Sequence, residues 1–362
     1  MKEIDIAVVG AGPAGLTAAA HAAEMGASVL LIERGQALGG QLVKQTHKFF
    51  GSRQEYAGER GFEIARKLMD RVETHPRITI WKNATTLGYY PDGVMTVKKD
   101  EQFHTLKPRK IIVATGASEK TLAFPNNDLP GIYGAGAVQT LMNVYGVMPA
   151  KRVLMVGAGN IGVIVAYQLL QAGVEVAAII EAAPKIGGYW VHASKIQRCG
   201  VPILTGHTIK QAHGTDRLEG VTICQLDEKW ATVPGTDQYL EVDGLCLAVG
   251  LSPLTELLWQ ADCKMEFVPE LGGYVPWRNA DLLTTHNNIY VAGDVAGVEE
   301  ASAAMVEGKL AGLAAAFSLN YQTDTFAADY REAKSQLNAL RAGPVSAKVC
   351  SGLCKVMLGE AI

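Results

Sequence analysis

Residues 6–15 read IAVVGAGPAG, and residues 153–162 read VLMVGAGNIG. In each stretch a short apolar segment runs into a Gly-x-Gly-x-x-Gly turn, the pattern of a strand followed directly by a helix. An acidic residue follows each copy, Glu33 in the first and Glu181 in the second, and a Gly-Gly pair begins six residues after each acid. One such pattern is weak evidence, but two matching copies indicate two α/β units that each hold a dinucleotide.

Each glycine of the turn has its own physical task. The first allows the tight turn, the second lets the backbone approach a pyrophosphate, and the third lets the helix pack closely on the strand. The pyrophosphate then meets free N–H groups at a helix N-terminus, and the two acids are expected to accept hydrogen bonds from an adenosine ribose. The alternative, in which the glycines only make turns and the acids are solvated strand ends, would have to hold twice. In order, the three glycines are Gly10, Gly12 and Gly15 in the first copy and Gly157, Gly159 and Gly162 in the second.

Composition places the chain among globular proteins. It has 362 residues, 48% of them hydrophobic and 19% charged, and its net charge is −3. This length favours more than one domain, and the charge offers no basic surface for nucleic acid. The six cysteines are scattered, as is typical of reduced thiols, and the apolar runs are too short to span a membrane. The first strand begins within a few residues of Met1 and leaves no room for a signal peptide, so we expect a cytoplasmic protein.

A third dinucleotide signal places the second unit inside the first. Residues 285–294 read THNNIYVAGD, an apolar strand that ends in Ala-Gly-Asp, and they follow the whole second unit. Each unit also contains antiparallel hairpin signals and a returning apolar strand that ends in glycine, at Gly116 and Gly250. The sequence therefore predicts an α/β fold with two Rossmann-like dinucleotide-binding domains, the second inserted in the first, and a C-terminal helical tail. The predicted boundaries are 1–122 and 271–322 for the first domain, 123–270 for the second, and 323–362 for the tail.

The strand that ends at Gly293 and Asp294 resembles the second flavin motif of the two-dinucleotide-binding-domain flavoproteins, the thioredoxin-reductase-like superfamily. In that superfamily the aspartate bonds the ribityl chain of FAD, and the following helix points its N-terminus at the flavin ring. Thr115 and Gly116 are similar to the Ala-Thr-Gly segment of the same proteins. The resemblance covers about residues 1–320 and implies FAD in the first domain and NAD(H) in the second. The residues it assigns to FAD are Gly10, Gly12, Pro13, Ala14, Gly15, Glu33, Gly40, Gln41, Thr115, Gly116, Gly293 and Asp294, and those it assigns to NAD(H) are Gly157, Gly159, Asn160, Ile161, Gly162, Glu181 and Gly250.

The segment after the first Gly-Gly pair lacks the cysteine pair with which many members of that superfamily relay electrons. Residues 41–47 read QLVKQTH. Without a dithiol, electrons must leave the flavin directly to a substrate or to another redox centre. Gln41, Lys44 and His47 are the polar residues that we place near the flavin as catalytic candidates, although His47 is equally explained as a loop histidine bonded to backbone. Hydride transfer itself requires only that the reacting atoms lie about 3–3.5 Å apart with water excluded.

Residues 129–141 carry a narrower resemblance. They read LPGIYGAGAVQTL and are similar to the FAD/NAD subunit of heteromeric amine and amino-acid dehydrogenases. That group includes dye-linked proline dehydrogenases together with the α subunit of sarcosine oxidase, the B subunit of hydrogen cyanide synthase and the A subunit of opine oxidase. In these complexes a partner subunit oxidises the amine at its own FAD, and electrons cross flavins and iron–sulfur centres. The resemblance therefore implies a partner subunit that carries the substrate site, the iron–sulfur centres, or both.

The tail contains two cysteines, Cys350 and Cys354, four residues apart. On a helix they share a face, either as small apolar residues of a docking helix or as half of a cluster or metal site that a partner completes. The apolar residues that follow Pro344 would be a liability in water, so we expect a partner subunit or a second copy to cover them. Because the last nucleotide motif precedes the tail, truncation after Leu340 is expected to leave flavin binding intact.

Three functions fit these motifs. The first is an FAD-dependent oxidoreductase that exchanges hydride with NAD(H), as the electron-transfer subunit of a heteromeric amine or amino-acid dehydrogenase. The second is a free-standing NADH-dependent reductase of a small acceptor or protein carrier, and the third is a non-catalytic nucleotide-binding scaffold. The missing dithiol and residues 129–141 favour the first over the second, and the intact second glycine motif argues against the third. Glu181 at the ribose position would repel a 2′-phosphate, so NAD(H) is expected rather than NADP(H).

Overall fold

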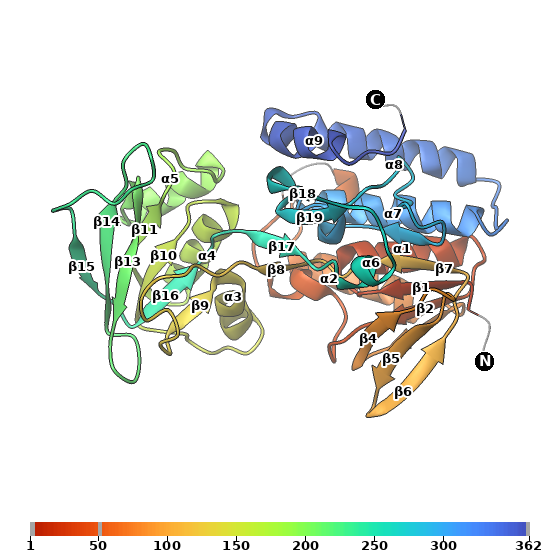
Figure 1. Ribbon diagram of the computed structural model, residues 1–362, viewed down its shortest axis with the longest axis horizontal. Coiled ribbons are helices and arrows are strands. Elements are labelled where there is room, and N and C mark those ends of the chain that lie inside the picture. The colour runs from red at the N-terminus through yellow and green to blue at the C-terminus, as the bar shows by residue number, and fades with distance from the viewer. Residues whose placement is uncertain (1–3, 50–52, 360–362) are drawn as a thin grey trace. The chain divides into compact units, whose positions relative to one another are not determined.

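The computed structural model describes residues 4–49 and 53–359. It divides into two compact units (Figure 1): Met1–Ser118 with Leu251–Ile362, and Glu119–Gly250. The second unit is therefore inserted in the first, as the order of the sequence motifs predicts.

The return to the first unit comes earlier than the sequence suggests. The sequence predicts residues 251–270 in the second domain, but they belong to the first unit. Leu254 explains the difference, because its N–H donates to the Gly116 carbonyl at 3.0 Å and its carbonyl accepts from the Thr115 hydroxyl at 2.7 Å. The chain leaves the first unit through β8 (Ala117–Glu119) and returns through β17 (Leu251–Pro253), and these two strands pair.

The first unit is built on five parallel strands, in spatial order β20 (Ile289–Val291), β7 (Lys110–Val113), β1 (Ile6–Val9), β2 (Val29–Ile32) and β3 (Ile78–Trp81). One face of this sheet packs against the helices α1 (Pro13–Glu24), α2 (Gly61–Glu73) and α7 (Ala301–Phe317). The other face packs against α6 (Glu256–Gln260) and an antiparallel sheet of β4 (Ala84–Tyr89), β5 (Met95–Lys99) and β6 (Gln102–Leu106). Every residue of β1 is buried, as expected for a strand of a parallel sheet covered on both faces.

Helices α1 and α7 lie unusually close together (Figure 1). A Cβ added to Gly308 would overlap the carbonyl oxygen of Ala14, and one added to Gly312 would overlap that of Ala18. Only glycine permits this backbone approach, and the neighbouring alanines fill the seam without forcing the helices apart. The packing fixes the start of α1 beside the segment that precedes α7.

The C-terminal tail packs on its own unit. It forms α8 (Phe326–Arg341), η5 (Pro344–Ser346) and α9 (Ala347–Cys354). Leu337 of α8 is buried in the α1–α7 core. Leu353 and Val356 are buried against the hairpin of β18 (Met265–Val268), η3 (Pro269–Leu271) and β19 (Gly273–Pro276). For Leu353 and Val356 the expectation that a partner covers them is wrong, because the first unit covers them itself, whereas Val349, Met357 and Leu358 are only half-buried.

The second unit repeats the spatial arrangement of the first, except that its edge strand β9 (Ile132–Gly134) precedes the other strands of its sheet in the chain, whereas β20 follows the others. Its parallel sheet has the order β12 (Ile203–Thr205), β11 (Glu175–Glu181), β10 (Arg152–Val156), β16 (Gly244–Leu247) and β9. Its helices are α3 (Ala135–Asn143), α4 (Asn160–Gln171) and α5 (Trp190–Arg198), and its antiparallel sheet contains β13 (His207–His213), β14 (Gly220–Gln225) and β15 (Gln238–Glu241). The predicted fold class, two Rossmann-like units with the second inserted and C-terminal helices, is confirmed.

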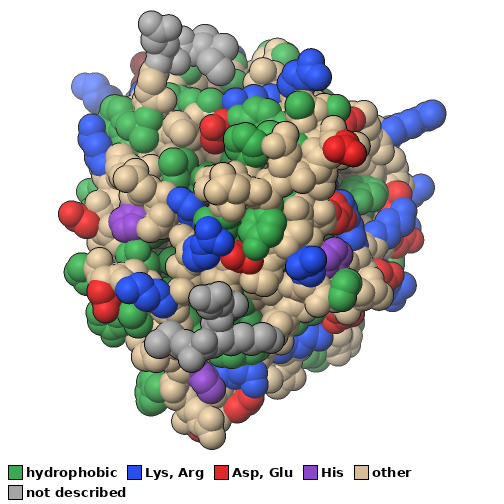
Figure 2. All heavy atoms as spheres, turned by 90° about the vertical axis from the view of Figure 1, so that its right-hand side faces the viewer, with side chains coloured by type: hydrophobic (Ala, Val, Ile, Leu, Met, Phe, Trp, Pro, Cys, Tyr) green, Lys and Arg blue, Asp and Glu red, His purple; other side chains and the backbone are tan. Residues whose placement is uncertain are grey.

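Two surface properties bear on partners. Among the described residues, no helix combines the length and the apolar character needed to cross a bilayer. On the face drawn in Figure 2, basic and acidic side chains are interspersed. This mixture agrees with the small net charge of −3.

Candidate nucleotide-binding sites

The first glycine turn is shaped by close backbone contacts. Gly10 has φ of +102°, and a Cβ there would overlap the carbonyl oxygen of Ala114. A Cβ on Gly15 would overlap the carbonyl oxygen of Gly10. Helix α1 begins at Pro13, whose fixed φ suits the first helical position and whose missing N–H costs nothing there. Gly10, Pro13 and Gly15 therefore set the backbone path of the turn.

Gly12 differs from its neighbours because a Cβ there would meet nothing within 4 Å. The backbone of the turn is thus open on the side where a pyrophosphate would approach the start of α1. Gly40 borders this opening, since a Cβ on Gly40 would lie 2.7 Å from the Gly12 Cα. Gly40 also begins η1 (Gly40–Lys44), so the Gly-Gly pair lies against the glycine turn.

Glu33 lies at the end of β2 and holds the turn from the other side. Its Oε2 accepts a hydrogen bond from the Ala11 N–H at 2.9 Å, and its Oε1 accepts one from the Gly35 N–H at 2.7 Å. Each carboxylate oxygen keeps a second lone pair, which is the one available to a ribose hydroxyl. The sequence predicted the acid near the turn but not its hydrogen bonds to the backbone.

The Gly293–Asp294 segment reaches the same end of the sheet. A Cβ on Gly293 would lie 2.9 Å from the Ala14 side chain, so the third dinucleotide signal lies against the start of α1. Asp294 begins η4 (Asp294–Ala296), and its Oδ1 accepts a hydrogen bond from the Glu299 N–H at 3.4 Å. Thr115 follows β7, the strand next to β20.

The environment of Asp294 is unfavourable for a charge. The pKa of Asp294 is raised to about 7, mainly by burial and also by the nearby carboxylates of Glu307, Glu299 and Glu300, while the hydrogen bond from the Glu299 N–H lowers it. Near neutral pH the carboxyl group can therefore donate as well as accept a hydrogen bond. Such a group suits the polyhydroxy chain of a flavin ribityl.

The three catalytic candidates lie on or just after η1. Gln41 is exposed, whereas Lys44 and His47 are half-buried. The His47 ring stacks on Phe49, with 5.7 Å between the ring centroids. The structure gives none of the three a chemical role, and they remain candidates by position alone.

The second glycine turn has the same geometry as the first. Gly157 has φ of +102°, and a Cβ there would overlap the carbonyl oxygen of Ala248. A Cβ on Gly162 would overlap the Gly157 carbonyl, whereas one on Gly159 would meet nothing within 4 Å. The second unit therefore has the same opening in front of its middle glycine, at the start of α4.

Glu181 in the second unit makes the hydrogen bonds that Glu33 makes in the first. Its Oε2 accepts the Ala158 N–H at 2.7 Å, and its Oε1 accepts the Ala183 N–H at 2.9 Å. Asn160, the first residue of α4, accepts the Tyr189 N–H at 2.8 Å and so ties the loop after Gly187-Gly188 to the turn. Ile161 is 40% exposed beside it. Gly250 is the last residue of the short segment 248–250, which begins at Ala248 directly after β16.

The tail cysteines do not form a recognisable metal site. Cys350 is half-buried and donates to the Arg341 carbonyl at 3.3 Å, and Cys354 is exposed. Within residues 4–49 and 53–359, no three His, Cys, Asp or Glu side chains are grouped so that they could hold a metal ion. An iron–sulfur cluster completed by a partner stays a prediction.

Sequence reasoning missed a set of buried charges behind Gly293. Glu307 on α7 is 3% exposed and Arg278 is 2% exposed, and Arg341 at the end of α8 reaches the Glu307 carboxylate. Glu307 is the only acid of α7, whose residues are mostly small or apolar, so a single acid in that run was the available signal.

Repeated parallel sheets with two matching glycine turns define a class of α/β proteins that bind two dinucleotides. The chain belongs to the pyridine nucleotide-disulphide oxidoreductase family, which matches residues 4–308. The suspected superfamily is thus confirmed, and the chain is a flavoprotein oxidoreductase by family.

The relatives of this chain are named as subunits of larger enzymes. The A subunit of opine oxidase from Agrobacterium tumefaciens is 29% identical over 86% of this chain, and the hydrogen cyanide synthase subunit HcnB of Pseudomonas protegens is 27% identical over 84%. The alpha subunit of sarcosine oxidase from Corynebacterium sp. is 28% identical over 88%. The chain spans 65%, 69% and 33%, respectively, of the length of these relatives. The narrower resemblance of the sequence is therefore confirmed.

Solved structures agree on the fold. L-proline dehydrogenase from P. horikoshii matches 91% of this chain and 59% of its own, with a TM-score of 0.71 and 24% identity. Thioredoxin reductase of T. acidophilum matches 88% of this chain and 100% of its own, with a TM-score of 0.71 and 20% identity.

The family implies FAD and a pyridine nucleotide, and the residues present fit both. Gly12 and Gly159 leave the backbone open where a pyrophosphate would lie, at the start of α1 and of α4. Glu33 and Glu181 retain acceptor positions for a ribose at each opening.

Proposed function

We propose that this chain binds FAD in the first unit and NAD(H) in the second and exchanges hydride between them. FAD supplies the redox chemistry when bound. The chain's own residues bind the cofactor by its pyrophosphate at Gly12 and by its ribityl chain at Asp294. The observation that carries the proposal is the complete second turn, with Gly159 open and Glu181 bonded to Ala158, because a purely structural unit has no need of that opening.

Nucleotide selectivity follows from the charge at the ribose position. The Glu181 carboxylate would repel a 2′-phosphate, while its free lone pairs suit two ribose hydroxyls. The next three residues, 182–184, read AAP and supply no arginine for a phosphate. NAD(H) is therefore the proposed nucleotide rather than NADP(H).

We further propose that the chain is the electron-transfer subunit of a heteromeric amine or amino-acid dehydrogenase. The support comes from relatives that are named as subunits of larger enzymes and from residues 41–47, which contain no cysteine pair. Without a dithiol relay, electrons have to pass to or from another redox centre, which a partner subunit would hold.

Comparison of the native assembly with the isolated chain tests the subunit role. The tagged chain is purified from its own cells, and the same chain is produced alone. The assembly is expected to reduce NAD⁺ with an amine or amino acid as electron donor, and the isolated chain is expected to lack that activity. An isolated chain that turns over NADH with a small acceptor at full rate would instead support a free-standing reductase.

A further inference from the structure

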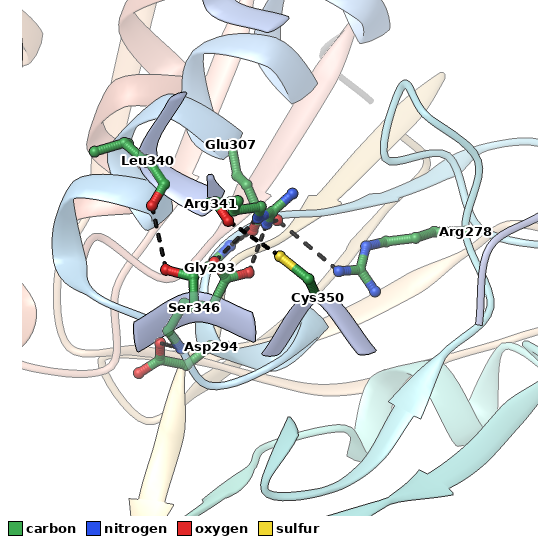
Figure 3. Close-up of polar contacts among 9 residues, drawn as sticks. Arg278, Gly293, Asp294, Glu307, Leu340, Arg341, Ser346 and Cys350 are labelled. Carbon is green, nitrogen blue, oxygen red and sulfur yellow. Dashed lines mark hydrogen bonds and ion pairs between the residues drawn. The ribbon is translucent and has the colours of Figure 1, made fainter. Parts of the chain in front are cut away.

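Glu307 supports the Gly293–Asp294 turn from inside the protein. Its Oε2 accepts a hydrogen bond from the Gly293 N–H at 2.8 Å, and the side chain is 3% exposed (Figure 3). An ionised carboxylate at such a position is costly unless cations and donors surround it. Cationic neighbours therefore have to offset the cost of burying this carboxylate.

Arg341, the last residue of α8, provides the nearest cation. Its Nη2 lies 2.6 Å from Glu307 Oε1 and 2.5 Å from Glu299 Oε1, and its Nε lies 3.0 Å from Glu299 Oε2. The guanidinium thus contacts two carboxylates. One is that of Glu307, which accepts the Gly293 N–H, and the other is that of Glu299, five residues after Asp294. The two carboxylates raise the pKa of Arg341 despite its burial, so this cation stays charged.

Arg278 is the second cation, and it is also tied to the tail. Its Nη2 lies 3.9 Å from Glu307 Oε1, and its Nη1 is buried with no hydrogen-bond partner among the described residues. The Arg278 N–H donates to the Val356 carbonyl at 3.0 Å, and the Arg278 carbonyl accepts the Leu358 N–H at 2.8 Å. Both cations next to Glu307 are therefore fixed by residues of the C-terminal tail.

Further contacts hold Arg341 in place. The Cys350 thiol donates to the Arg341 carbonyl at 3.3 Å, and the Ser346 hydroxyl donates to the Leu340 carbonyl at 3.2 Å (Figure 3). The family match ends at residue 308, before α8 begins. Glu307 lies within the match, but Arg341 and the tail residues that hold Arg278 lie beyond it.

We infer that Arg341 is a positioning residue for the flavin: it keeps the Glu307 carboxylate aimed at the Gly293 N–H and so fixes the turn that presents Asp294. The inference rests on the proposed binding of FAD at Gly293 and Asp294. In this inference Arg341 acts through Glu307, whose Oε1 lies 2.6 Å from the Arg341 Nη2.

Three variants on α8 test the inference. Arg341→Met keeps the length of the side chain without its charge, Arg341→Lys keeps one charge, and Arg331→Met is the matched control on the exposed side of the same helix. FAD dissociation is followed by flavin fluorescence after dilution, and the visible absorption spectrum and midpoint potential of the bound flavin are recorded. These last two readouts report the surroundings of the flavin, which a general loss of stability leaves unchanged while the protein is folded.

Arg341→Met is expected to release FAD about tenfold faster or more and to shift the flavin spectrum, since removing one partner of a buried charge pair is costly. Arg341→Lys should lie between Arg341→Met and wild type, and Arg331→Met should match wild type. If Arg341→Met does not fold, Arg341→Lys decides, because a lysine cannot bridge two carboxylates as a guanidinium does.

FAD release and spectra that are unchanged in the folded Arg341 variants would overturn the inference while leaving the proposed function in place. Wild-type protein that binds no FAD would overturn the proposed function itself. A Glu307→Gln background adds a second check: Arg341→Met should cost less there, and equal costs in both backgrounds would show that Arg341 does not act through Glu307.

Discussion

Glu181 accepts a hydrogen bond from the backbone N–H of Ala158 at 2.7 Å, so the acid at the end of β11 is bonded directly to the glycine turn after β10. The Ala183 N–H bonds the other carboxylate oxygen at 2.9 Å, which leaves little freedom to the side chain. A charge held so firmly beside the turn gives the site a fixed means of discriminating between ribose and ribose phosphate.

The first prediction concerns nucleotide preference. Glu181→Ala removes both the ribose acceptors and the repulsion of a 2′-phosphate, so the ratio of kcat/KM for NADH to that for NADPH should fall about ten- to hundredfold. The matched variant Glu33→Ala alters the other unit and should weaken FAD retention without changing that ratio. A wild-type enzyme that prefers NADPH would contradict the account.

Two glycines of the first turn should respond in opposite ways to alanine. Gly10→Ala forces a left-handed φ and a clash with the Ala114 carbonyl, so it should lower the free energy of unfolding by about 1–3 kcal/mol or more. Gly12→Ala meets open space at φ of −75° and should leave the flavin-free protein within about 0.5 kcal/mol of wild type while abolishing FAD binding. Chemical denaturation and flavin content measure the two effects, and normal FAD content in Gly12→Ala would place the cofactor elsewhere.

The raised pKa of Asp294 predicts a pH dependence of stability. Because burial lifts this pKa from its usual value near 4 to about 7, the stabilising contribution of the protonated form is complete below about pH 4 and is lost as the pH rises through about 7. In flavin-free protein, the Tm of wild type relative to Asp294→Asn should therefore fall between about pH 4 and pH 7. A Tm difference that stays constant over this range would show that Asp294 titrates normally.

Truncation of the tail should damage the first unit. A chain that ends after Leu340 lacks Arg341 and the buried Leu353 and Val356, and it leaves Glu307 without its nearest cation. We expect a loss of about 3–5 kcal/mol in the free energy of unfolding and loss of FAD, the reverse of the expectation from sequence. A chain that ends after Gly359 serves as the control, and full FAD content after truncation at Leu340 would restore the sequence-based view.

The predictable part of the molecule is local in sequence. Gly10 and Gly157 indicate their turns because the required backbone conformation disfavours other residues, and Glu33 and Glu181 follow 23 and 24 residues later. The repeated strand–turn–helix order then determines both sheets.

The unpredictable part depends on contacts between distant segments. Arg341 contacts Glu307 because α8 packs on α7. The residues next to each of them in the sequence give no indication of this pair. Leu353 is buried by the β18–β19 hairpin, which is distant from it in the sequence. The sequence of the tail alone therefore suggests an exposed apolar segment that a partner would cover. The early return at Leu254 rests on two hydrogen bonds to the Thr115–Gly116 segment, which no composition change marks.

Anaerobic addition of NADH to the purified flavoprotein tests the central claim most directly. Wild type should lose its visible flavin absorption promptly, as should Gly343→Ala, a control in which the new methyl group also meets open space at a permitted φ. Gly159→Ala should keep its flavin and its fold but bleach far more slowly, because the methyl group occupies the opening before α4. A wild-type flavin that NADH does not bleach on any timescale would contradict hydride exchange and leave a nucleotide-binding scaffold.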